Sequence, residues 1–188
     1  EYIEPSSTLK GKWFELPSKN REIKSMAFGN EVYVGVGEDL LGYSYDGRQW
    51  DFLNEGSISG VINEVIFANG RFVAVGYDRI YTSLNGREWK ETEIGADNHL
   101  FSIAYGNGKF VSVGSVGVFT SEDGVKWEHH RDSLYWTNLW GICFGDNQFV
   151  AVGPYISATS KDGIIWEYNK IPFKKGMGYL HGVAYANG

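Results

Sequence analysis

A seven-residue phrase, SYDGRQW at positions 44–50, decides the fold because the chain repeats it three more times. The other copies are SLNGREW (83–89), SEDGVKW (121–127) and SKDGIIW (160–166). Their closing tryptophans stand 39, 38 and 39 residues apart, and another glycine recurs seven residues before each serine, at Gly37, Gly76, Gly114 and Gly153. Self-similarity at one period over so many positions identifies an internal-repeat protein.

Each repeated unit reads as four short strands. In the second unit the first strand ends at Phe67, a turn leads to the run that ends at Gly76, and the third strand covers 80–83. We expect the fourth strand to begin at the tryptophan, after a two-residue turn at the Asp–Gly or Asn–Gly pair, because such pairs favour positive φ. No segment shows sustained helical periodicity. The units therefore predict an all-β fold, a β-propeller of four-stranded antiparallel blades.

One propeller domain is expected over residues 1–188, with a partial blade at each end. The complete blades cover approximately 21–54, 60–93, 98–131 and 137–170, and single strands flank them at 12–16 and 179–188. Propellers close with about four to eight blades. The flanking strands thus indicate either a fragment of a larger propeller or a ring that closes through a second copy. Open blade edges would also allow self-association.

Composition and charge narrow the classes of partner. The chain has 43% hydrophobic residues, which is typical of a folded protein, and its apolar runs are too short for a membrane-spanning helix. A net charge of −6 disfavours nucleic acid, since phosphates require a basic surface. Cys143 is the single cysteine, so no internal disulfide forms. We expect neither a nucleic-acid partner nor membrane insertion.

The repeated phrase resembles the Asp-box, or BNR repeat, of sialidases and other secreted propellers, in a shortened form, S-x-D-G-x-x-W. The resemblance extends over residues 12–188 and implies the propeller fold together with a cell-surface or extracellular location. It also implies a structural role for the boxes, whose Ser and Asp side chains can bond to the turn backbone while the Trp packs between blades. These residues are Ser44, Asp46, Trp50, Ser83, Asn85, Trp89, Ser121, Asp123, Trp127, Ser160, Asp162 and Trp166. One acidic turn per blade cannot converge on one ion, so no metal or cofactor is expected.

One position changes identity in every unit while its neighbours repeat. It directly follows the apolar residue that opens each first strand, and it reads Lys24, Asn63, Phe101, Trp140 and His181. First strands line the channel of a propeller, so we expect this column to surround the channel mouth on the face with variable loops. Either these side chains plug the channel irregularly or they contact a ligand. Further candidates for ligand contact on that face are Tyr77, Arg79, Trp136, Tyr155 and Tyr179.

Three functions remain open. The leading interpretation is a non-catalytic binding propeller for a carbohydrate or protein ligand, at a cell surface or outside the cell. The first alternative is a glycan-active enzyme of the sialidase or glycosidase type with catalytic residues partly outside this segment. The arginine motif of sialidases is absent, and no carboxylate pair has a distinguishing environment, so no catalytic residue is assigned. The second alternative is a structural or assembly module.

Overall fold

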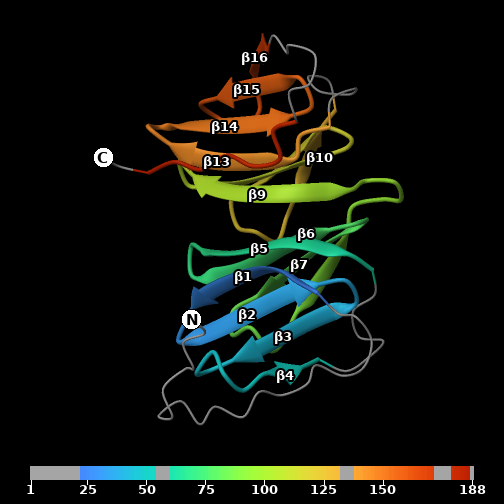
Figure 1. Ribbon diagram of the computed structural model, residues 1–188, viewed down its shortest axis with the longest axis vertical. Helices are drawn as coiled ribbons and strands as arrows, with labels where there is room; N and C mark the ends of the chain where they lie inside the picture. Colours follow the sequence, from blue (N-terminus) through green and yellow to red (C-terminus); the bar gives the residue numbers. More distant parts are fainter. Residues whose placement is uncertain (1–21, 54–59, 132–137, 172–178, 187–188) are drawn as a thin grey trace, which may run out of the picture.

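The computed structural model describes residues 22–53, 60–131, 138–171 and 179–186. These residues form four antiparallel sheets, each made of four strands that follow one another in the chain (Figure 1). The first two sheets are β1 (Ile23–Gly29), β2 (Val32–Gly37), β3 (Leu40–Ser44), β4 (Asp51–Phe52) and β5 (Ile62–Ala68), β6 (Arg71–Gly76), β7 (Arg79–Ser83), β8 (Lys90–Glu93). The last two are β9 (Leu100–Gly106), β10 (Lys109–Gly114), β11 (Val118–Ser121), β12 (Glu128–His130) and β13 (Gly141–Gly145), β14 (Gln148–Gly153), β15 (Ile156–Ser160), β16 (Glu167–Lys170).

The four sheets are the blades of a β-propeller. Successive first strands contact one another, β1 with β5, β5 with β9 and β9 with β13, while each fourth strand lies at the far edge of its sheet (Figure 1). This arrangement confirms the predicted all-β propeller with four complete blades. Within the residues described, no helix has the length and hydrophobicity needed to cross a membrane.

Of the two single strands expected at the ends, only the second lies within the residues that the structure describes. Residues 12–16 lie outside the described residues. Residues 179–186 run beside β13 in the place of the next first strand, although they form no strand ladder. Their Tyr185 ring covers Gly145, where an added Cβ would meet the ring at 2.0 Å. The same aromatic-on-glycine contact joins complete blades, as Phe144 covers Gly106.

The hydrophobic core lies between blades rather than within them. One cluster joins Val73 and Val75 of the second blade to Leu100 and Phe110 of the third, all fully buried. Trp127, from a repeated phrase, packs against this cluster. Removing such apolar surface from water stabilises by about 1.5–3 kcal/mol for each large side chain. Every blade therefore depends on its neighbour for part of its stability.

Two-residue turns join the first and second strands. In the first blade the turn is Asn30–Glu31, with φ of 47° and 62°. In the third blade it is Asn107–Gly108, with φ of 49° and 73°. Positive φ at both central residues is the geometry of the tight hairpin turn whose twist matches that of paired strands.

The prediction of a two-residue turn within the repeated phrase is wrong. Between β11 and β12 the connection spans six residues, and the fourth strand begins one residue after the tryptophan. Ser121 Oγ accepts the N–H of Gly124 at 2.8 Å, and Asp123 Oδ1 accepts those of Val125 and Lys126, both at 2.8 Å. These side-chain bonds hold a longer loop than the Asp–Gly pair alone suggests, and the other three blades repeat them.

The phrase carboxylates should make the protein sensitive to acid. The pKa of Asp46 and of Asp123 is lowered by the backbone N–H groups that each carboxylate accepts. In the second blade Asn85 accepts the equivalent N–H groups at 3.0 and 2.9 Å without a charge. Because the folded pKa lies below the unfolded value of about 3.9, this stabilisation is complete above that pH and is lost as the pH falls through the folded pKa.

We therefore expect the Asp46→Asn/Asp123→Asn variant to lose less stability than the wild type on acidification. The measurement is the free energy of urea unfolding at steps from about pH 6 to about pH 2. Glu122→Gln serves as the control, because Glu122 lies in the same loop and forms none of the loop bonds described above. Parallel pH profiles for the wild type and the double variant would contradict the prediction.

Candidate functional site

The five variable residues of the first strands lie around one cavity of about 220 Å³. Each comes from a different inner segment, because the position occurs once per unit. The segments are β1, β5, β9, the residue before β13 and residues 179–186, which supply Lys24, Asn63, Phe101, Trp140 and His181 respectively. The fold thus brings together side chains that are spread over positions 24 to 181 of the chain. We call this cavity the channel-mouth cavity.

A row of aromatic side chains leads from this cavity to the surface. Trp140 stacks on His181, with ring centroids 4.6 Å apart and planes at 16°, and meets Tyr179 edge-on at 5.6 Å. Tyr179 in turn meets Tyr155 at 5.2 Å, and the Tyr155 hydroxyl donates to the Tyr179 hydroxyl at 3.0 Å. We call these four residues the aromatic strip. About half of each tyrosine is exposed, so the strip offers flat apolar surface with polar ends, as binding faces often do.

Polar side chains from the inner strands hold adjacent blades together. Asn63 donates through Nδ2 to the Leu100 carbonyl at 2.7 Å. One residue further along β1, β5 and β9, a side-chain oxygen accepts a backbone N–H from the next inner strand. These bonds join Ser25 to Val65 at 3.1 Å, Glu64 to Ile103 at 2.7 Å and Ser102 to Ile142 at 3.1 Å. We call this the bridging position.

Glu64 is the exception at the bridging position. The corresponding residues in the other units are Ser25, Ser102, Gly141 and Gly182, all small and uncharged. Glu64 is half-buried and lines the channel-mouth cavity. Burial raises the pKa of its carboxyl group, and hydrogen bonds from the Ser102 hydroxyl and the Ile103 N–H oppose that change. Sequence reasoning missed Glu64, although a lone charge in a column of small residues was a visible signal.

The remaining candidates lie elsewhere. Tyr77 packs on the His99 ring, with centroids 4.1 Å apart, and Arg79 pairs with Glu91 at 2.5 Å between β7 and β8. Neither lines the channel-mouth cavity. Trp136 lies outside the described residues. In the part of the chain that the structure describes, no group of three or more His, Cys, Asp or Glu could hold a metal ion.

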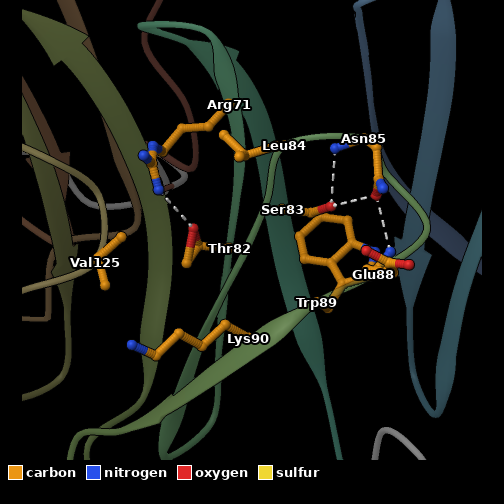
Figure 2. A pocket seen from close by; sticks show the side chains of 9 residues that line it. All are labelled: Arg71, Thr82, Ser83, Leu84, Asn85, Glu88, Trp89, Lys90 and Val125. Carbon is orange, nitrogen blue, oxygen red and sulfur yellow. Dashed lines mark hydrogen bonds between the residues drawn. The ribbon is translucent and has the colours of Figure 1, made fainter.

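A second hollow, of about 420 Å³, lies beside the repeated phrase of the second blade (Figure 2). Trp89, Ser83 and Asn85 of that phrase form part of its wall, and Arg71 Nη1 donates to Thr82 Oγ1 at 3.4 Å. The serine and asparagine are already engaged in the turn bonds of the phrase. Because Ser83 and Trp89 recur in every blade and the polar side chains of Ser83 and Asn85 are already bonded, we consider the channel mouth the better candidate for a specific site.

The chain matches no protein-family model and no curated protein. It is similar to solved propeller structures at low sequence identity. One is YCF48 bound to D1 peptide, with 19% identity and a TM-score of 0.61 over 84% of this chain and 55% of that one. Another is the nidogen/laminin complex, with 15% identity and a TM-score of 0.65 over 92% and 72%. A third is virginiamycin B lyase from Staphylococcus aureus with quinupristin, with 12% identity and a TM-score of 0.76 over 90% and 61%.

The chain thus spans about half to three quarters of the length of these proteins. At such low identity the likeness concerns the fold alone. By their names, two of the structures are complexes with a peptide or protein, and the third is an enzyme. Their shared architecture agrees with the four blades described above. The chain is therefore a β-propeller protein by its structure.

Proposed function

We propose that this protein is a non-catalytic binding propeller whose channel mouth holds a segment of a protein ligand. The observation that carries the proposal is the convergence of five non-repeated side chains on the channel-mouth cavity. Asn63 also forms a blade-to-blade hydrogen bond, but a scaffold built from repeats does not require a different residue at this position in each unit. Binding specificity, in contrast, requires such differences.

The size of the cavity favours a side chain over a whole small molecule. Its volume of about 220 Å³ is below the roughly 300–1,000 Å³ of pockets that enclose drug-sized ligands. The aromatic strip extends the contact outward, where an extended peptide could lie across Tyr179 and Tyr155. Two of the similar structures contain peptide or protein partners according to their names, YCF48 bound to D1 peptide and the nidogen/laminin complex. A protein ligand is therefore preferred to a carbohydrate.

We also propose an action at a cell surface or outside the cell. The support for this location is the resemblance of the repeated phrase to the Asp-boxes of secreted propellers.

The proposal predicts that the Phe101→Ala/Trp140→Ala variant loses ligand binding. Truncating a hot-spot aromatic residue at the centre of an interface costs about 2 kcal/mol or more, so the loss of even one of these two contacts should lower the affinity by at least about thirtyfold. The probes are a phage-displayed random peptide library and, separately, a glycan array. Peptides selected by the wild type are then titrated against the variant by calorimetry.

Tyr45→Ala is the matched control, because Tyr45 is an aromatic residue that is 58% exposed and does not line the cavity. Its affinity for the selected peptides should equal that of the wild type. Thermal unfolding shows whether the double variant remains folded. Unchanged binding by a folded double variant would overturn the proposed site, and recognition of glycans without peptides would overturn the protein ligand.

A further inference from the structure

Glu64 has a higher desolvation cost than the hydrogen bond at the bridging position requires. Ser25 and Ser102 each accept the N–H of the next inner strand with a neutral hydroxyl. Glu64 forms the equivalent bond with one carboxylate oxygen. Withdrawing a carboxylate from water is much more costly than withdrawing a hydroxyl. Blade-to-blade bonding thus accounts for an oxygen at this position but not for a charge.

The charge of Glu64 has no counter-ion among the residues that the structure describes. Lys24 is the cationic residue of the same cavity, but its side chain is exposed at the rim and does not pair with Glu64. His181 is held by its stacking on Trp140. The carboxyl group is therefore a partly buried acid that borders a cavity, an arrangement that marks a candidate functional site.

The walls of the cavity suit such a cation. The inner segments that follow Glu64 supply Phe101 and Trp140, so aromatic rings and a carboxylate border one space. Aromatic faces attract ammonium and guanidinium groups, with more effect when water is excluded. The volume of about 220 Å³ admits one long side chain. The net charge of −6 would also attract basic segments from solution.

We propose that the channel-mouth cavity receives the side chain of a lysine or arginine from the bound protein segment, with Glu64 as its counter-charge. This inference rests on the proposed function and specifies the chemistry that the ligand must present. Phe101 and Trp140 would flank the aliphatic stem and the cationic head, while the neighbouring residues of the ligand lie along the aromatic strip.

The test uses short acetylated and amidated glycine-rich peptides that differ in one central residue: arginine, lysine or the neutral arginine analogue citrulline. Binding is followed by NMR through the indole N–H signal of Trp140 and by calorimetry. We expect arginine and lysine peptides to bind at least about tenfold more tightly than the citrulline peptide, in keeping with a charge-assisted contact in a partly buried site.

Glu64→Gln is the decisive variant, because glutamine keeps an oxygen that can accept the Ile103 N–H and removes the charge, while it replaces the second carboxylate oxygen by an NH2 group. It should abolish the preference for arginine over citrulline. Glu122→Gln, which removes an equal charge from an exposed loop outside the cavity, should retain that preference.

Equal affinity for arginine and citrulline peptides, an unchanged preference in Glu64→Gln, or no binding of either cationic peptide would overturn this inference. None of these results would decide the proposed function, which is tested separately by the Phe101→Ala/Trp140→Ala variant with peptides selected from a random library. Peptides that are selected through Phe101 and Trp140 but lack lysine and arginine would thus refute the cation pocket and retain the binding propeller.

Discussion

Replacing Gly114 by alanine is expected to destabilise the protein by about 3 kcal/mol or more, as overpacking without room to relax does. The added Cβ would lie 1.9 Å from the His99 carbonyl oxygen and 2.8 Å from its carbon. Both atoms belong to the backbone that leads into β9, so neither can rotate away as a side chain would. The φ of Gly114 is not positive, so the glycine serves the close approach rather than an unusual backbone conformation.

The recurrence of this contact makes the prediction general. Each second strand ends in a glycine over which the incoming backbone passes. An added Cβ would meet Glu22 O at 1.9 Å at Gly37, Val61 O at 2.1 Å at Gly76 and Asn138 O at 2.0 Å at Gly153. The blade-to-blade connection can thus follow the end of the second strand closely only where no side chain intervenes.

Urea unfolding monitored by tryptophan fluorescence measures the effect of Gly114→Ala. Gly182→Ala is the control, because no heavy atom lies within 4 Å of the position of its added Cβ. That variant should change the free energy of unfolding by no more than about 0.5 kcal/mol. Failure of Gly114→Ala to fold would agree with the prediction, whereas equal stability of the two variants would contradict it.

The second large effect is expected for Phe110→Ala, at about 3–5 kcal/mol of unfolding free energy. Phe110 is fully buried between the second and third blades, and its ring contacts Tyr105 at 4.6 Å and Trp127 at 6.4 Å between centroids. Truncation would remove the buried area and leave a cavity that the stiff sheets cannot easily close.

Tyr33→Ala provides a matched comparison. Tyr33 occupies the same position in the second strand of the first blade, but it is 36% exposed and contacts Phe28, which is itself 56% exposed. Its truncation should cost clearly less than that of Phe110, because the side chain is already 36% exposed and packs on an exposed ring. The two variants are compared by the midpoint and slope of urea unfolding. Similar losses at both positions would show that the packing between blades is not the source of the stability.

Much of the fold can be predicted from the sequence, because a repeat is strong evidence for a repeated structural unit. Four copies of one phrase establish the unit, and the positions of its glycines and apolar runs define the strands. The Asp–Gly pair on its own indicates a two-residue turn, because it carries no information on the bonds of the neighbouring side chains. In the structure, Ser121 and Asp123 bond to the loop backbone and stabilise a six-residue connection.

The candidate site can be predicted from the sequence only in part. The column that includes Lys24 and Trp140 could be located because a variable position in a repeat departs from its surroundings, and the fold gathers it at one cavity. Whether the column binds a ligand stays a prediction. Glu64 was missed because the environment of a polar residue in a half-buried strand depends on the register of the neighbouring blade. Arg79, a loop residue by sequence, lies in β7 and pairs with Glu91.

The bonds at the bridging position have an evolutionary consequence. They join residues 40, 39 and 40 positions apart, in each case one position more than the length of the unit that they span. Duplication of a unit whose bridging residue carries a side-chain oxygen therefore recreates such a bond, whereas a shorter insertion between two bonded residues changes their spacing. Each duplicated unit would also add one new side chain to the rim of the channel mouth. The gain or loss of units can thus change the ligand specificity of the encoded propeller while the type of hydrogen bond between its blades is kept.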